Sequence, residues 1–244
     1  CTPEKCPYAK GHFDRVNDAV YELWTTEEVY SREVIRAHAE KWQVCPFEMC
    51  LDLSVWVDGV ICDYNYAFDP NVHLKRFFGE NISGDYIFLI DEAHNLVERG
   101  REMYSAEVSR QTLLTLRKKI RKHFPKLARA LDKASRQMLE LEEDLKASQN
   151  PYQVLSNPGV LPITFLTISG ELEEILEEKN LEEELRKEIL EFYFVVRDFL
   201  NVSELVDENY VVYTECFGEN DFQLRLFCVN PAANLGEYLK KGRS

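Results

Sequence analysis

Apolar residues follow two different patterns along the chain, and each pattern predicts a different kind of element. Residues 7–44 show helical spacing, and Thr25 with Glu28 forms a capping box that would open a helix there. The segments 57–61 and 86–90 ("VDGVI" and "YIFLI") are instead rich in β-branched and other apolar residues, which predicts buried strands. Runs of this kind are typical of parallel strands that are covered on both faces.

The spacing becomes helical after the second of these runs. Apolar residues recur mostly every three or four positions up to Leu145, and Pro125 is placed to open the second of two helices. After a turn-rich segment at 148–162, the same spacing returns at 170–200, with glutamates on the opposite side. We therefore predict an all-helical block at 106–205.

Strand character returns after this block. The segments 210–217 ("YVVYTECF") and 222–230 ("FQLRLFCVN") flank the turn residues "GEND", and this pattern predicts a β-hairpin. Residues 231–242 ("PAANLGEYLKKG") then have helical spacing with a proline in the first turn. Strands on both sides of a helical block indicate a small α/β element with a helical insertion. The predicted fold class is therefore mainly α with α/β.

Charge and composition limit the kinds of partner. The chain has 29 Lys and Arg against 43 Asp and Glu, which gives a net charge of −14. Any contact with DNA must therefore use a local basic patch rather than the field of the whole molecule. No apolar segment approaches the length of a membrane span, and there is no signal peptide. The first residue is Cys1 rather than Met, so we expect a piece of a longer protein.

The residues that follow the run 86–90 are Asp91-Glu92-Ala93-His94. A buried parallel strand delivers its next residues to the edge of the sheet where α/β folds bind ligands. There an aspartate can hold Mg²⁺ on a nucleotide, and an adjacent glutamate can polarise the attacking water. The alternative is a surface turn whose acidic residues merely favour the start of a helix.

A phosphate-binding loop of the form G-x-x-x-x-G-K-[ST] does not occur in the sequence. The nearest match is "GEYLKKGRS" at 236–244, whose glycines are one residue too far apart and which has Arg243 in place of the lysine. The chain thus carries the metal-and-water half of an ATPase site without the phosphate half.

Four of the 7 cysteines gather near the start of the chain, in "CTPEKCP" and "CPFEMC". These four are Cys1, Cys6, Cys45 and Cys50. Cysteines on turn-rich loops with a following proline are typical of iron–sulfur sites, whereas zinc sites more often contain C-x₂-C pairs. The spacing favours an iron–sulfur cluster and leaves zinc open. The other three cysteines, predicted to be buried small hydrophobic residues, are Cys62, Cys216 and Cys228.

The segment "CPFEMCLDLSVWVDGVICDYNYAFDP" resembles a part of the iron–sulfur DNA helicases of the XPD and DinG type, in particular the bacterial DinG-like members. In that family a Cys-Pro pair, a strand, a Tyr-x-Tyr…Asp-Pro signature and a DEAH box follow one another. The corresponding features here are Cys45-Pro46, residues 57–62, Tyr64-Asn65-Tyr66 with Asp69-Pro70, and residues 91–94. The order and approximate spacing of all four features agree.

The resemblance covers essentially the whole chain and implies its domain organisation. Residues 1–55 would be an iron–sulfur domain, 56–105 part of a RecA-like motor domain, 106–205 a helical arch, and 206–244 the return to the motor domain. The parent protein would be a monomeric, cytoplasmic bacterial 5′→3′ DNA helicase of repair or replication. Its phosphate loop and second motor domain would lie outside these residues, so we expect no ATP hydrolysis by the 244 residues alone.

The resemblance also implies roles for individual residues. Asp91 would bind Mg²⁺ and ATP, Glu92 would activate water, and His94 would link the nucleotide state to DNA contacts. The four early cysteines would hold a 4Fe–4S cluster, which the chain taken alone could lose. Cys50 is the uncertain ligand, because the fourth ligand could instead precede Cys1.

The run "RKKIRKHFPKLAR" at 117–129 is the strongest basic patch in this acidic chain. The family threads single-stranded DNA between the arch and the cluster domain, so this run could line the path, although a solubilising surface is an equal alternative. Tyrosines of the signature could stack on bases, whereas Trp42 and Trp56 fit a buried core better. The candidate DNA contacts are Tyr64, Tyr66, Lys118, Lys119, Arg121 and Lys122. A different function also stays open, namely a non-catalytic, metal-bearing module that docks proteins or binds DNA.

Overall fold

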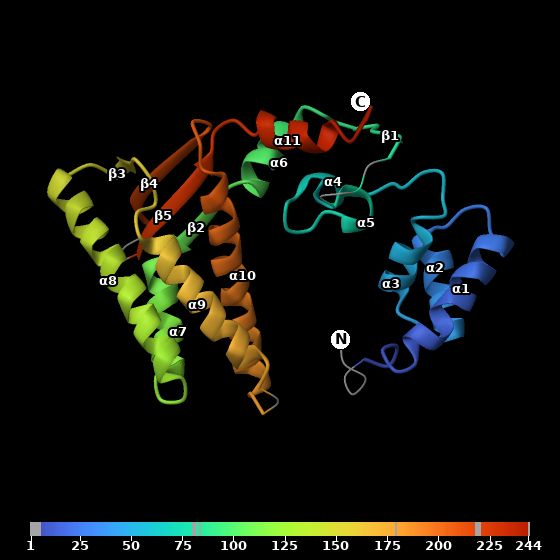
Figure 1. Cartoon of the computed structure of the whole chain (residues 1–244), viewed down its shortest axis with the longest axis horizontal. Helices are drawn as coiled ribbons and strands as arrows, with labels where there is room; N and C mark the ends of the chain where they lie inside the picture. The colour runs from blue at the N-terminus through green and yellow to red at the C-terminus, as the bar shows by residue number, and fades with distance from the viewer. Residues whose placement is uncertain (1–5, 80–81, 83, 179, 218–220, 244) are drawn as a thin grey trace. The chain divides into compact units, whose positions relative to one another are not determined.

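The computed structural model describes residues 6–79, 82, 84–178, 180–217 and 221–243 (Figure 1). The chain divides into two compact units, Cys1–Asp63 and Tyr64–Ser244, called unit 1 and unit 2 below.

Unit 1 is built from the helices α1 (His12–Thr26), α2 (Arg32–Trp42) and α3 (Pro46–Leu53). One face of each helix contributes to a shared apolar core that includes Leu23, Ile35 and Met49. A proline opens α3. Backbone N–H groups in the first turn of a helix have no partner within the helix, so a proline there costs no hydrogen bond. The helical character predicted for residues 7–44 is therefore confirmed.

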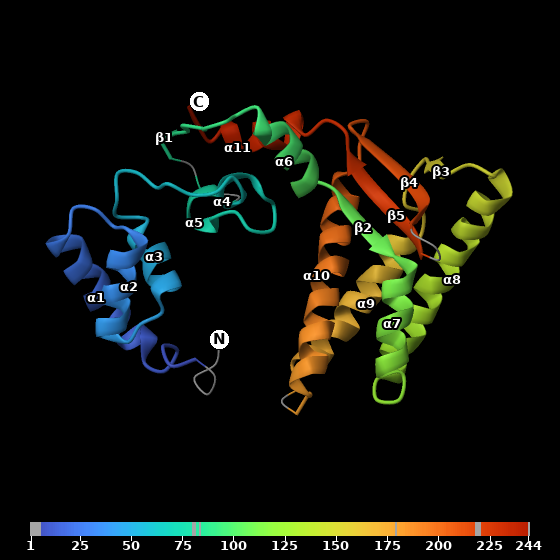
Figure 2. The ribbon, with the colours of Figure 1, turned by 180° about the vertical axis from the view of Figure 1, so that it is seen from behind.

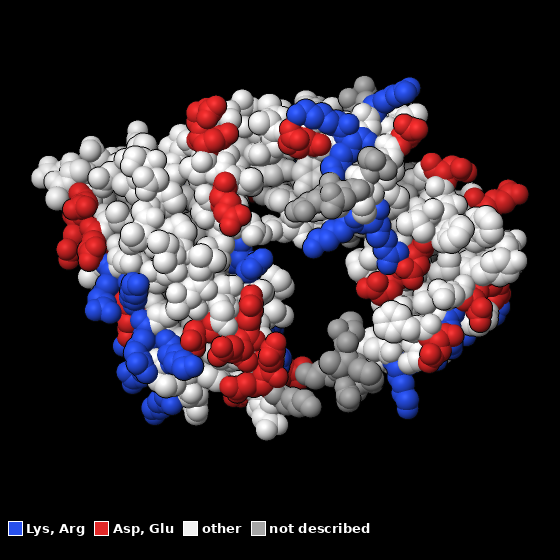
Figure 3. All heavy atoms as spheres, viewed as in Figure 1, with Lys and Arg blue, Asp and Glu red and all other residues white. Residues whose placement is uncertain are grey.

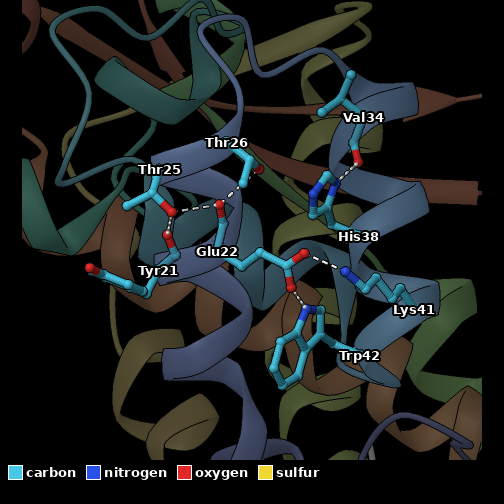
Figure 4. A network of polar contacts seen from close by, with 8 residues as sticks. All are labelled: Tyr21, Glu22, Thr25, Thr26, Val34, His38, Lys41 and Trp42. Atoms are coloured by element: carbon cyan, nitrogen blue, oxygen red, sulfur yellow. Dashed lines mark hydrogen bonds and ion pairs between the residues drawn. The ribbon is translucent and has the colours of Figure 1, made fainter.

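The boundary between α1 and α2 differs from the prediction. Thr25 lies in the last turn of α1, and its hydroxyl donates to the carbonyl oxygen of Tyr21 at 2.8 Å (Figure 4). The residue that caps α2 is Ser31, whose hydroxyl oxygen accepts a hydrogen bond from the Val34 N–H at 3.3 Å. A threonine hydroxyl can bond either way along the backbone, so the capping box at Thr25 was the wrong interpretation.

The strand predicted at 57–61 is wrong. Residues 54–63 are irregular, and the side chains of Ile61 and Trp56 are 105% and 61% exposed. A short β-branched run becomes a strand only when a neighbouring strand pairs with it, and no described strand pairs with this one. Cys62 is exposed for the same reason, so the predictions that Trp56 and Cys62 are buried are also wrong.

Unit 2 contains a short parallel pair of strands, β1 (Tyr86–Ile87) and β6 (Gly242–Arg243). The pairing continues through Phe88, whose N–H donates to the carbonyl oxygen of Arg243 at 2.7 Å. The parallel pairing is as predicted, but the strand predicted at 86–90 is only two residues long, and Ile87 and Leu89 are exposed rather than covered. Within the described part of the chain β6 is the one strand beside β1, and a single neighbour cannot bury both faces.

Short helices precede and follow these two strands in the sequence. They are α4 (Asn65–Phe68) and α5 (Lys75–Phe78) before β1, α6 (Asn95–Met103) after β1, and α11 (Ala232–Leu239) before β6. The helix α11 begins after Pro231, as predicted. The near-match to a phosphate loop at 236–244 starts inside α11 and runs into β6. A Cβ atom at Gly242 would lie 2.8 Å from the Tyr86 carbonyl oxygen, so this glycine serves the close approach of two strands.

A second, antiparallel sheet has the order β2-β5-β4-β3. Its strands are β2 (Ala106–Ser109), β3 (Tyr152–Leu155), β4 (Tyr210–Phe217) and β5 (Asp221–Cys228). The predicted hairpin of β4 and β5 is confirmed, while three of its four predicted turn residues, 218–220, lie outside the described residues. Cys228 is buried in β5 and Cys216 is exposed on β4, so the prediction is correct for Cys228 and wrong for Cys216.

The block at 106–205 is therefore not all-helical. The strands β2 and β3 lie within it and pair with β5 and β4. Each is only four residues long, which is the shortest length at which an alternating pattern indicates a strand. Their strand character comes from the neighbours that they pair with.

The helices of this block lie on one face of the antiparallel sheet (Figures 1 and 2). They are α7 (Arg110–Ile120), α8 (Pro125–Ser148), α9 (Leu161–Leu176) and α10 (Glu183–Leu205). Pro125 opens α8 as predicted, but the glutamate-rich stretch that was expected to be one helix divides into α9 and α10. The rings of Phe165 and Phe199 meet edge to face in the core, with centroids 5.0 Å apart. Among the described helices, none is both long and apolar enough to cross a bilayer.

Candidate functional site

The residues after β1 form a tight turn that leads into α6. Residues 91–94 make this turn, and the Asn95 N–H donates to the carbonyl oxygen of Glu92 at 2.8 Å. Glu92 has a φ of 48°, in the left-handed region that residues other than glycine rarely adopt. The acidic pair thus stands just before the start of a helix, where negative charge is favoured.

The three predicted catalytic side chains are close together and exposed on this turn. The Glu92 N–H donates to Oδ1 of Asp91 at 2.9 Å, and Nδ1 of His94 lies 3.4 Å from Oε2 of Glu92. Carboxylate oxygens that also reach solvent are the donors that hydrated Mg²⁺ prefers. The donor set of Asp91 and Glu92 therefore fits a magnesium ion.

Tyr64 supports the turn from another part of unit 2. Its hydroxyl donates to the carbonyl oxygen of Asp91 and lies 3.2 Å from the carbonyl oxygen of Glu92. The partners of the Tyr64 hydroxyl are thus backbone atoms of the turn. Tyr66, the other tyrosine of the signature, is half-buried in α4.

The helix after Tyr64 is fixed to the core of unit 2. Phe68 at the end of α4 is 2% exposed, and its carbonyl oxygen accepts a hydrogen bond of 2.7 Å from the hydroxyl of Tyr104. Burial raises the pKa of the Tyr104 phenol, so this hydroxyl stays protonated and keeps donating. Sequence reasoning did not identify Tyr104, whose partner lies 36 positions away.

Three of the four predicted cluster cysteines belong to the described residues, and Cys1 lies outside them. Cys6 and Cys45 are half-buried, whereas Cys50 is exposed and lies more than one helical turn beyond Cys45. No group of three or more His, Cys, Asp or Glu in the described part of the chain is arranged to hold a metal ion. The described cysteines alone therefore do not form a complete ligand set for a cluster.

Hydrogen bonds nevertheless hold the loop at Cys45 against the start of α1. The Cys45 N–H donates to Nδ1 of His12, which is buried at the first position of α1, at 3.2 Å. The guanidinium group of Arg15, one turn further on, donates to the carbonyl oxygen of Gln43 at 2.6 Å. The segment that leads from Cys6 into α1 and the loop before α3 are thus connected at one end of unit 1.

The predicted basic residues lie where α7 connects to α8. Figure 3 shows Lys and Arg side chains gathered over this end of unit 2, and Asp and Glu side chains over the adjacent ends of α9 and α10. Lys118, Arg121 and Lys122 are exposed and have no ion pair with a described residue, and the same is true of Lys126 at the start of α8. Lys119 differs, because its Nζ lies 2.6 and 2.7 Å from the two carboxylate oxygens of Glu188 on α10.

Comparison with known proteins relates the first part of the chain to helicases. The DEAD_2 family model, a helicase-family domain, matches residues 2–113. The Fanconi anemia group J protein homolog of Gallus gallus is 31% identical over 100 residues, which are 41% of this chain and 7% of that relative. The aligned part thus spans a small fraction of the length of the relative. The matched region contains residues 2–63 of unit 1, Tyr64 and the turn at 91–94, and it is helicase-related in sequence.

Proposed function

We propose that the parent protein of this chain is an ATP-dependent DNA helicase and that the turn at 91–94 carries the metal-and-water half of its ATPase site. The observation that carries this proposal is the placement of Asp91, Glu92 and His94. They stand together after a parallel strand and inside the region that matches DEAD_2. The carboxyl end of a parallel strand is where α/β folds bind nucleotides.

Each residue of the turn has a separate role in ATP hydrolysis. Oδ1 of Asp91 accepts the Glu92 N–H, so Oδ2 is the oxygen that Asp91 would direct toward a hydrated ion. Mg²⁺ bound there would neutralise negative charge on the phosphate oxygens. Glu92 orients a water molecule and accepts its proton, and His94, whose Nδ1 lies 3.4 Å from the Glu92 carboxylate, would link the nucleotide state to DNA contacts.

Substitutions in the whole parent protein test this division. Glu92→Gln keeps the size of the side chain but removes the base, so kcat for DNA-stimulated hydrolysis should fall by about 10²-fold or more. Glu98→Gln is the matched control, because Glu98 is an exposed glutamate one turn further along, on α6. Hydrolysis by Glu92→Gln at the rate of the control would refute the proposal.

The polarity of movement, the substrate and the setting follow from the resemblance to the XPD and DinG type. The parent protein would translocate 5′→3′ on single-stranded DNA, as a monomer in the bacterial cytoplasm, in repair or replication. The four exposed basic residues at the α7–α8 connection would contact the phosphates of the strand. Unwinding of a partial duplex that carries a 5′ single-stranded tail, and not of one that carries a 3′ tail, would support this polarity.

A 4Fe–4S cluster in unit 1 is the cofactor that the early cysteines suggest. Its support is the Cys-Pro spacing and the connection between the loop at Cys45 and the segment after Cys6. Cys1, Cys6 and Cys45 would be three ligands, and the fourth would be Cys50 or a residue that precedes Cys1 in the parent protein. Iron in elemental analysis, together with visible absorption, would support the cluster, whereas colourless protein containing zinc would exclude it.

A further inference from the structure

We infer that Tyr64 is a positioning residue for the acidic turn, and this role rests on the proposed ATPase function. The Tyr64 hydroxyl reaches the carbonyl oxygens of both Asp91 and Glu92, so it contacts the two residues assigned to metal and water. It touches only their backbone. Tyr64 would therefore act on the reaction through the orientation of the turn rather than by contact with nucleotide.

The turn needs such support because part of its backbone is strained. Glu92 adopts the left-handed conformation with φ 48°, which is unfavourable for a non-glycine residue and persists only when surrounding contacts hold it. The carbonyl oxygen of Glu92 already accepts from the Asn95 N–H. The Tyr64 hydroxyl adds a second contact to this oxygen and fixes the preceding peptide through the carbonyl oxygen of Asp91.

Tyr64 can hold the turn because its own position is fixed. Its backbone carbonyl oxygen accepts the Phe68 N–H at 2.9 Å, and Phe68 is buried and bonded to Tyr104. The Tyr64 ring packs against the core of unit 2. The support of the turn thus runs from the buried core through α4 to the hydroxyl of Tyr64.

Tyr64→Phe removes the hydroxyl and keeps the ring, and Tyr152→Phe is its matched control. Tyr152 is an exposed tyrosine on β3 of the same unit, and its hydroxyl makes no hydrogen bond with a described residue. Hydrogen exchange of the backbone amides of Asn95 and Leu96, which donate into the turn, reports its stability without any need for activity. In the 244-residue chain, Tyr64→Phe should accelerate this exchange about 5-fold, the effect of one ordinary hydrogen bond. Tyr152→Phe should leave it unchanged, and equal exchange in both variants would overturn the inference.

Measuring ATP hydrolysis by the parent protein distinguishes the role of Tyr64 from the proposed ATPase function. Tyr64→Phe should lower kcat about 5- to 10-fold and raise the Mg²⁺ concentration for half-maximal rate, with little change in KM for ATP. A merely structural role would lower the melting temperature without this change in Mg²⁺ dependence. If hydrolysis depends on Glu92 but is the same in Tyr64→Phe and Tyr152→Phe, the role of Tyr64 is refuted and the proposed function stands. If hydrolysis does not depend on Glu92, the proposed function itself fails.

Discussion

The most direct prediction concerns the salt dependence of DNA binding. Changing Lys118, Arg121, Lys122 and Lys126 to glutamine removes four exposed basic residues at the α7–α8 connection, each without an ion pair to a described residue. Each phosphate contact to single-stranded DNA contributes about 0.7 to the slope of log affinity against log salt. If all four contact phosphates, the slope should become shallower by about 3. The affinity at ~0.1 M salt should fall by about 10² to 10³, since these contacts matter least near 1 M.

Lys119→Gln provides the matched control. Its Nζ is bound to both carboxylate oxygens of Glu188, so Lys119 would have to give up this pair to bind a phosphate. We therefore expect little change in slope for Lys119→Gln. Fluorescence anisotropy of a labelled oligothymidylate, titrated at several salt concentrations, measures both variants. The reasoning is refuted if the fourfold variant keeps the original slope, or if Lys119→Gln alone lowers it as much.

The remaining predictions concern stability and the cluster. Phe199→Ala empties a fully buried core position on α10, so it should lower the free energy of unfolding of unit 2 by about 3–5 kcal/mol. Phe194→Ala, at a position 60% exposed on the same helix, should lower it by less than about 0.5 kcal/mol. Urea unfolding followed by circular dichroism measures both variants. All 3 tryptophans lie in unit 1, so their fluorescence transition should not move in either variant. Hydrogen bonds from Lys41 and Trp42 lower the pKa of Glu22 below its ordinary 4.5 (Figure 4). The stability that Glu22 contributes is therefore present above pH 4.5 and is lost as the pH falls through the lowered pKa. Melting followed by tryptophan fluorescence should show a weaker acid dependence in Glu22→Gln. Cys50→Ser should leave the iron content of the parent protein unchanged, and a loss of iron would identify Cys50 as the fourth ligand.

The elements that the sequence predicted well are those whose signal is local and repeated. The helical spacing through Leu145 covers many turns, and Pro125 marks a helix start by itself. The failures are short segments whose structure depends on a distant partner. Residues 57–61 have strand composition but no described partner strand, whereas the four-residue segments β2 and β3 are strands because β5 and β4 pair with them.

The same distinction applies to the candidate site. Asp91, Glu92 and His94 are neighbours in sequence, so their grouping could be predicted from the chain alone. The contact between Tyr64 and Asp91 joins residues 27 positions apart, and the pair of Lys119 with Glu188 joins residues 69 positions apart. Neither contact leaves a sequence pattern. These long-range partners decide which tyrosine supports the turn and which lysines stay available to a ligand.

The pairing of β2 with β5 has a consequence for how the chain folds. Ala106, where the chain enters the large insertion, lies opposite Leu226, near where the chain leaves it. Once the insertion has formed, the ends of the chain that emerge from it are therefore neighbours. The entropy cost of closing the β1–β6 pair is then that of a short loop rather than of more than a hundred loose residues. If the insertion forms first, it brings the two distant strands of the parallel pair together. For the same reason, a tight turn that joined Ala106 directly to Leu226 would be a rational way to delete the insertion by protein engineering.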